Sequence, residues 1–276
     1  MNISEVNQNS FSKAVALIKA SGLPTEDISD ITKLFAATEG DEVLGTIGIE
    51  FYDKVALLRS LAVTEVMRSK GLGKQLVEFI ERFAKQNGAM ELILLTTTAA
   101  DFFTKKAYQP IERNNVPDAI KQSTEFTSTC PSSAILMRKS LKNKILFVCI
   151  ENSNRSQMAQ AFATIHGNNK IEAYSAGSRP SGKINPKAIA AMKELNYDLN
   201  THSSKSLEEV KSLAPFDTLV TMGCGDACPW MPAKKFIDWQ IPDPREMNEE
   251  DFRKVRDLIE IKVKALVGSL VNSDNQ

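Results

Sequence analysis

Several residue types on which common architectures depend are scarce in this sequence. Its 276 residues include four cysteines and two histidines. Four cysteines are too few to hold a chain of this length together by disulfides, and two histidines argue against a histidine-rich metal site. No apolar run approaches the roughly 18 residues that a membrane-spanning helix needs. The first residues lack the basic region and apolar core of an export signal, so we expect a soluble, cytoplasmic protein.

An excess of charge is also missing. The chain has 34 basic and 34 acidic residues, so electrostatics give no reason to expect nucleic acid or an anionic membrane as a partner. Apolar residues make up 42% and charged residues 25%, which is ordinary globular usage. The length corresponds to roughly two domains, each long enough to bury its own core.

A short basic and polar stretch, RKSLKN at residues 138–143, separates two different patterns. Before it, residues 133–137 are predicted to form a strand. After it, KILFVC at residues 144–149 is the kind of apolar strand that opens an α/β domain. No Pro- or Gly-rich spacer follows, so the two parts are expected to be closely tethered. We predict domains at residues 1–140 and 141–276.

The first half is predicted to be an α+β domain with a mixed sheet. Phe11, Val15 and Ile18 recur at helical spacing, and two strand patterns flank a hairpin turn at Gly40-Asp41. A helix from 71 to 87 carries an apolar stripe formed by Leu72, Leu76, Ile80 and Phe83. The remaining predicted elements are strands at 55–63 and 91–96 and a short helix at 99–108.

The second half alternates strands with helices. Strands are predicted at 144–149, 171–177 and 218–223, and helices at about 156–166, 186–196 and 248–268. This alternation predicts an α/β domain with a parallel sheet and helices on both sides.

The segment CIENSNRS, from Cys149 to Ser156, joins a predicted strand to a predicted helix. Ligands bind at the carboxyl ends of strands in such sheets. The loop's backbone N–H groups and the helix N-terminus are expected to point at a tetrahedral oxyanion, and Arg155 adds a planar fork for two oxygens. The same positive field stabilises a thiolate, which makes Cys149 a nucleophile at neutral pH. The alternative is a buried cysteine beside an incidental surface arginine.

The rest of this loop is assigned to the anion as well. Ser156 is expected to donate a hydrogen bond to the sulfur, and Asn152 to brace the loop. The predicted oxyanion-binding residues are Glu151, Asn152, Ser153, Asn154 and Ser156.

The spacing of Cys149, five residues and then Arg155-Ser156 is similar to that of the low-molecular-weight tyrosine phosphatases. SNRSQMAQAF resembles more closely the arsenate reductases that share that fold. The resemblance covers residues 144 to about 268. It implies that Cys149 attacks arsenic and that Asp243, in Ile-Pro-Asp-Pro, protonates the departing oxygen. The alternative for Asp243 is an ordinary Asp-Pro turn.

Two later cysteines bear on the choice between these activities. Cys224 and Cys228 stand four residues apart in VTMGCGDACP. Water completes a phosphatase reaction, whereas a reductase must supply two electrons from thiols. The resemblance implies that Cys224 attacks Cys149, that Cys228 then displaces Cys149, and that thioredoxin reduces the resulting disulfide. The alternatives are a zinc half-site, inert thiols, or a phosphatase whose late cysteines give redox protection.

This half departs from its relatives at two places. Arg245-Glu246 follow the Asp-Pro pair where related phosphatases tend to carry tyrosines, which weakens the aryl-phosphate interpretation. Gln160 stands where some thioredoxin-linked reductases have a glutamate tied to a potassium site, which argues against potassium dependence.

A glycine-containing loop in the first half follows the strand at 55–63 and opens the helix at 71–87. Glycines let the backbone approach a pyrophosphate, whose charge meets the helix N-terminus. The pattern resembles the Arg/Gln-x-x-Gly-x-Gly/Ala motif of GNAT acetyltransferases, which implies acetyl-CoA as cosubstrate. A Rossmann dinucleotide site fits less well, because only two glycines are present. The predicted cofactor-binding residues are Arg68, Ser69, Lys70, Gly71, Leu72, Gly73 and Lys74 for the pyrophosphate, and Leu61, Ala62 and Val63, where the strand diverges from its neighbour, for the pantetheine arm.

Over residues 21–140, segments such as LLTTTAADFF and VPDAIKQSTEF resemble acetyltransferases associated with arsenic resistance. This implies acetyl transfer to a small amine, for example an arsenic-containing amino acid. Phe102-Phe103 replaces the Phe-Tyr pair that supplies a general acid in many GNAT enzymes, so catalysis is expected to rest on positioning, with water as base. The alternative is an inactive module that senses acetyl-CoA.

Tyr108 is expected to pack in the interior. Cys130, which precedes Pro131 in a loop, is expected to be a small buried residue. Arg59, charged within an apolar strand, either faces a substrate anion or extends to the sheet edge.

Overall fold

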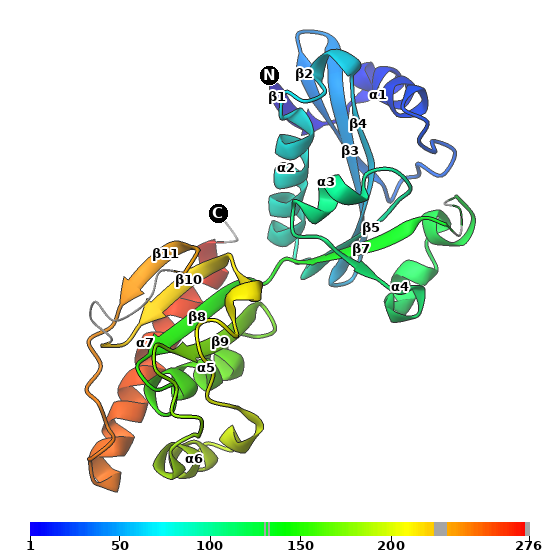
Figure 1. Ribbon diagram of the computed structural model, residues 1–276. Coiled ribbons are helices and arrows are strands. Elements are labelled where there is room, and N and C mark those ends of the chain that lie inside the picture. The colour runs from blue at the N-terminus through cyan, green and yellow to red at the C-terminus, as the bar shows by residue number, and fades with distance from the viewer. Residues whose placement is uncertain (130, 132, 224–230, 274–276) are drawn as a thin grey trace. The chain divides into compact units, whose positions relative to one another are not determined.

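The computed structural model describes residues 1–129, 131, 133–223 and 231–273 (Figure 1). The chain divides into two compact units, Met1–Leu141 and Lys142–Gln276. Strand β7 (Ile135–Ser140) ends the first unit and strand β8 (Asn143–Cys149) opens the second. Most of the polar stretch at 138–143 therefore belongs to strands rather than to a linker. Within the described part of the chain, no helix is long and apolar enough to cross a membrane.

The first unit is built on a seven-stranded mixed sheet with the order β1-β2-β3-β4-β5-β7-β6. Neighbouring strands are antiparallel except for β4 and β5, which are parallel. The pairing of β4 with β5 ends at Leu57 and Ile93, so β4 diverges from β5 along its second half. The strand bounds are β1 Asn2–Glu5, β2 Lys33–Glu39, β3 Glu42–Tyr52, β4 Val55–Val63, β5 Glu91–Thr96 and β6 Gln109–Ile111.

Local sequence patterns account for most of this unit. Gly40, at φ +57°, and Asp41 form the predicted two-residue turn between β2 and β3. The long helix α2 buries its predicted stripe of Leu72, Leu76 and Ile80 against the sheet. The helices are α1 Gln8–Ala20, α2 Leu72–Gln86, α3 Ala100–Thr104 and α4 Asp118–Lys121, with short helical turns at Glu65–Met67, Arg113–Asn115 and Glu125–Thr129.

The apolar stripe of α1 differs from the prediction. Phe11 is 49% exposed, whereas Ala14 and Ile18 are buried. Residues i, i+3 and i+4 share one face of a helix, so Phe11 lies on the same side as Ala14 and Ile18. Phe11 stands in the first turn of the helix and remains half exposed.

The second unit is an α/β domain with a four-stranded parallel sheet in the order β11-β10-β8-β9. Strand β11 (Ala233–Asp238) was not expected, because it is an edge strand whose lysines and Phe236 are exposed and leave little apolar pattern. The other elements are β9 Ile171–Gly177, β10 Phe216–Thr221, α5 Arg155–His166, α6 Pro186–Lys193 and α7 Glu249–Ser273, with short helical turns at Leu199–Thr201 and Lys211–Leu213.

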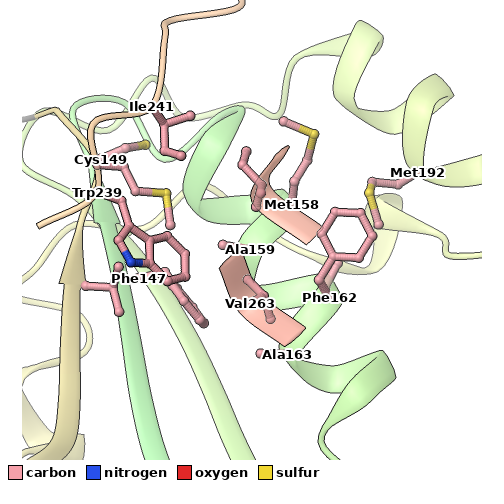
Figure 2. Packing of buried hydrophobic residues seen from close by; sticks show 14 of the residues in the cluster. Phe147, Cys149, Met158, Ala159, Phe162, Ala163, Met192, Trp239, Ile241 and Val263 are labelled. Carbon is pink, nitrogen blue, oxygen red and sulfur yellow. The ribbon is translucent and has the colours of Figure 1, made fainter. Parts of the chain in front are cut away.

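The α-helices that the structure describes in this unit pack against one face of the sheet. Phe147 and its neighbours on one face pack with α5, α6 and α7, as Figure 2 shows for Met158, Phe162 and Val263. The opposite face, which includes Leu146 and Val148, packs with residues of the turn-rich segment 207–214.

Candidate functional site

The loop after β8 turns sharply at the base of α5. Asn152 has a φ of +50°, a conformation that asparagine tolerates better than most residues. The neighbouring strand β9 ends at Gly177, where a Cβ atom would lie 2.7 Å from the backbone oxygen of Ile150 and 2.9 Å from the backbone nitrogen of Asn152. Gly177 therefore lets the loop pass close to β9. In the sequence, the one feature that could have pointed to this role is the position of Gly177 at the end of a predicted strand.

The sulfur of Cys149 is buried and surrounded by donors. The backbone N–H of Asn152 donates to Sγ over 3.2 Å, and Ser156 Oγ lies 3.0 Å from Sγ. Ser156 Oγ already accepts a hydrogen bond from Asn152 Nδ2 at 2.9 Å, so its own hydrogen is available to the sulfur. Two hydrogen-bond donors are therefore directed at this one sulfur.

Asn152 is fixed in turn by a buried amide. Gln157 Nε2 donates to the backbone oxygen and to Oδ1 of Asn152 over 3.1 and 2.9 Å. The backbone N–H of Lys205 donates to the same Oδ1 over 2.7 Å. The amide group of Asn152 is therefore oriented with its Nδ2 toward Ser156.

A histidine and a tyrosine continue this chain. His202 Nδ1 lies 2.9 Å from Gln157 Oε1, and His202 Nε2 lies 2.9 Å from Tyr197 Oη. Because Gln157 Oε1 only accepts, Nδ1 carries a proton. Burial, with a contribution from Lys205, lowers the pKa of His202, so the imidazole is neutral at pH 7 and Nε2 accepts from Tyr197. The hydrogen bonds therefore run in one direction, from Tyr197 through His202, Gln157, Asn152 and Ser156 to the sulfur.

Arg155 connects the loop to the segment that follows β11. The Arg155 side chain is buried, Nη1 donates to the backbone oxygen of Ile241 over 3.0 Å, and Nη2 lies 3.4 Å from Oδ2 of Asp243. Figure 2 shows Ile241 beside Cys149 at the end of β8. The fold thus brings Asp243 to the loop through Arg155, 88 residues away in the sequence.

The other predicted loop residues have different surroundings. Glu151 Oε1 lies 2.6 Å from Nη2 of Arg245, and Ser153 Oγ donates to Glu151 Oε2 over 3.4 Å. Asn154 precedes α5 without capping it through its side chain, and its buried Oδ1 has no hydrogen-bond partner.

The two late cysteines, Cys224 and Cys228, lie outside the described residues. Gly223, which precedes them at φ +68°, comes close to the guanidinium, since a Cβ there would lie 3.0 Å from Nη1 of Arg155. Cys130 also lies outside the described residues. Among the side chains that the structure does describe, no three of His, Cys, Asp or Glu gather as metal ligands.

The glycine-containing loop of the first unit is more open. Gly71, at φ +86°, precedes α2, and nothing lies within 4 Å of a Cβ built there. A Cβ at Gly73 would make only ordinary contacts, the nearest to Phe102 at 3.6 Å. The Arg68 side chain is 60% exposed and lies 3.9 Å from Glu65. Packing within the protein therefore does not require glycine at position 73.

Comparison with known proteins places both units. Residues 144–276 match the low molecular weight phosphotyrosine protein phosphatase family, and residues 15–109 match the acetyltransferase (GNAT) family. A "Glutaredoxin arsenate reductase" of Synechocystis sp. is 36% identical over 130 residues, which are 98% of that protein and 46% of this chain. The chain belongs to the arsenate reductase family. It is a fusion, with a GNAT domain ahead of the reductase-family unit.

Further relatives of the reductase-family unit bear the same description. "Arsenate reductase 2" of Staphylococcus saprophyticus is 39% identical over 127 residues, 95% of that protein and 45% of this chain. A solved arsenate reductase in its phosphate-binding state is 36% identical, with 98% of that chain and 46% of this one covered and a TM-score of 0.43.

In the reductase-family unit, Gln160 makes a local contact. Its Oε1 accepts a hydrogen bond from Ser175 Oγ over 2.6 Å. His202, Gln157 and Tyr197 were missed by the sequence analysis, because each is a common residue type without a spacing that signals function. Only their hydrogen bonds single them out.

In the GNAT domain, Tyr108 packs as predicted. It is buried edge-to-face against Phe103, and burial raises the pKa of its phenol well above the ordinary value. Its hydroxyl therefore stays protonated.

Both interpretations of Arg59 were wrong. Its side chain is 2% exposed, and its nitrogens lie 2.5 Å from Asp27, 2.6 Å from Glu50 and 3.4 Å from Glu125. Opposite charges hold it because a buried guanidinium needs partners. It ties the segment before β2, strand β3 and the segment after α4 to β4, and it is not free to meet a substrate anion.

Proposed function

We propose that the reductase-family unit reduces arsenate to arsenite with Cys149 as nucleophile. The observation that carries the proposal is the sulfur of Cys149, held by two donors at the start of α5. Arg155 supplies the charge for an oxyanion there. The names of the relatives, which are arsenate reductases, favour arsenate as the oxyanion.

The proposed reaction begins with an exchange of bonds at arsenic. The Cys149 thiolate forms a sulfur–arsenic bond while an arsenic–oxygen bond breaks, and Asp243 gives a proton to the departing oxygen. Cys224 then attacks the sulfur of Cys149. The sulfur–arsenic bond breaks, its electron pair stays on arsenic, and arsenite leaves.

Two thiols supply the two electrons and reset the nucleophile. Cys228 attacks Cys224 and displaces Cys149 as a thiolate, which leaves a 224–228 disulfide. We propose thioredoxin as the donor that reduces this disulfide. Glutaredoxin is the competing donor, because one relative bears that name.

The decisive experiment supplies purified protein with arsenate, NADPH and either the thioredoxin system or the glutaredoxin and glutathione system. We expect NADPH oxidation that depends on arsenate and is faster with thioredoxin. Faster oxidation with glutaredoxin would reassign the donor. Phenyl phosphate hydrolysis without NADPH oxidation in either system would instead favour a phosphatase.

The resolving thiols have their own test. We expect Cys224→Ser and Cys228→Ser each to stop turnover while Cys149 still reacts once. Mass spectrometry of the arsenate-treated wild type should find the 224–228 disulfide. Zinc bound by these thiols would contradict their role.

We also propose that the GNAT domain transfers acetyl from acetyl-CoA to a small amine. The loop Arg68–Lys74 would hold the pyrophosphate, and the backbone of residues 61–63 would hold the pantetheine arm where β4 diverges from β5. The open space beside Gly71 supports this placement. Thiol release from acetyl-CoA over a panel of amines tests it, and binding without turnover would favour the sensor alternative.

A further inference from the structure

A second arginine lies beside the groups proposed to react. The backbone N–H of Arg245 donates to Oδ1 of Asp243 over 3.2 Å. The Arg245 guanidinium Nη2 lies 2.6 Å from Oε1 of Glu151 and 4.0 Å from Oδ2 of Asp243. The Arg245–Glu151 ion pair therefore connects the segment that carries Asp243 to the loop that carries Cys149.

Both ends of this ion pair belong to anchored backbone. Ser204 Oγ donates to the backbone oxygen of Glu151 over 3.0 Å. On the other side, Lys187 Nζ donates to the backbone oxygens of Arg245 and Met247 over 3.3 and 2.7 Å. The pair thus joins two fixed segments, and its position is set by the fold.

Exposure rises from the sulfur outward. Cys149 is 3% exposed and the Arg155 side chain 7%, whereas the side chains of Asp243 and Arg245 are 43% and 45% exposed. In a displacement at a tetrahedral centre, the departing group leaves on the side opposite the nucleophile, and Asp243 is the residue proposed to protonate it. The departing group therefore faces Asp243 and the ion pair beside it.

We propose that the Arg245–Glu151 ion pair selects free tetrahedral oxyanions over their esters. The departing oxygen of free arsenate or phosphate carries at most a proton, so it needs no room beyond the ion pair. The carbon group of an ester extends past Asp243 toward solvent, so the pair must open before an ester can bind. This inference rests on the roles proposed for Cys149 and Asp243.

An aryl phosphate ester tests the pair without the reductase cycle. The Cys149 thiolate would form a sulfur–phosphorus bond while the phosphorus–oxygen bond to the phenol breaks, and Asp243 would protonate the phenolate. Water then hydrolyses the sulfur–phosphorus bond and returns the thiolate and phosphate. No electrons are transferred, so no donor is needed.

The experiment compares wild type, Arg245→Gln, Glu151→Gln and the double variant. Two quantities are measured: kcat/KM for p-nitrophenyl phosphate, and Ki for inorganic phosphate as a competitive inhibitor. We call the product of these two quantities the ester preference. A general loss of attraction for anions lowers kcat/KM and raises Ki, so it leaves the product unchanged. We expect each single variant to raise the ester preference about fivefold, the ratio for an exposed ion pair worth ~1 kcal/mol. The double variant should rise no further, because either change opens the same pair.

Other outcomes would overturn the proposal. No rise in either single variant, including no detectable hydrolysis, would remove the pair as a barrier to esters. A rise in Arg245→Gln alone would assign the effect to the charge of Arg245 and not to the pair.

Arg253→Gln is the matched control. It removes another partly exposed Arg–Glu pair of this unit, in which Arg253 lies 2.8 Å from Glu194, and it should leave the ester preference unchanged. An equal rise there would overturn the proposal. Arsenate reduction with a thiol donor is assayed on the same proteins. Its absence in the wild type would reject the proposed reductase activity, while the ester preference still decides the role of the pair.

Discussion

Two loops in this chain join a strand to a helix N-terminus, and they are built in different ways. Around Cys149 the side chains of Asn152, Ser156 and Gln157 are buried and bonded to one another. Around Gly71 the loop is open, and Arg68 is largely exposed. A nucleophile must be held in one ionisation state and one orientation before substrate arrives. A coenzyme pyrophosphate needs mainly backbone donors and room to approach.

The largest effect should come from removing the nucleophile. Cys149→Ser is expected to abolish arsenate reduction, because a serine hydroxyl stays protonated at neutral pH. Arg155→Lys should be nearly as damaging, since a point charge cannot replace the bidentate fork. NADPH-coupled arsenate assays measure both. Acetyl-CoA binding by the same proteins is the control and should be unchanged, so its loss would contradict the independence of the two loops.

A glycine substitution beside each loop sharpens the contrast. Gly177→Ala is expected to lower arsenate reduction tenfold or more, because the new Cβ would lie 2.7 Å from the backbone oxygen of Ile150 and displace the loop. Gly71→Ala meets no atom within 4 Å, and its positive φ should cost only about 1 kcal/mol of stability. Steady-state kinetics and chemical unfolding measure these effects. A Gly177→Ala protein with wild-type kinetics would show that the close approach is not needed.

Coenzyme binding should depend on Gly73. Gly73→Val is expected to weaken acetyl-CoA binding about tenfold, because the branched side chain adds bulk at the helix N-terminus beside the proposed pyrophosphate position. Calorimetric titration measures the affinity, with arsenate reduction as the control activity. Unchanged affinity would reject the placement of the pyrophosphate. Loss of both activities in a folded protein would show that the units are coupled.

The smallest effect concerns pH. Burial lowers the pKa of His202 in the folded chain. As the pH falls below about 6.5, His202 is therefore protonated in the unfolded chain before it is protonated in the folded chain. The contribution of His202 to stability is full above that pH and declines as pH falls toward the lowered folded value. His202→Gln keeps one donor and one acceptor and should flatten this decline.

Urea unfolding at pH 8 and pH 5 measures the pH effect. His166→Gln, which removes the other histidine, is the control for a general loss of imidazole. A decline as steep in His202→Gln as in the wild type would assign the acid sensitivity to other groups.

Local patterns in the sequence were enough for the elements that hold the two loops. The strand ending at Cys149, the helix starting at Arg155 and the stripe of α2 are signalled by residues close together in the chain, because apolar periodicity and turn chemistry act over a few residues. The edge strand β11 was not predicted, because its exposed residues do not show the apolar pattern of a buried strand.

Only the tertiary structure decided which distant side chains meet. His202 contacts Gln157, which lies 45 residues away in the sequence. Arg245, in the segment after β11, contacts Glu151 in the loop after β8. Arg59 is held by three carboxylates and not by a substrate or solvent. The sequence shows that these groups are polar, but their partners depend on how strands and helices pack. A buried polar group must find a partner wherever the fold places one, and that place is not encoded by any short stretch of the chain.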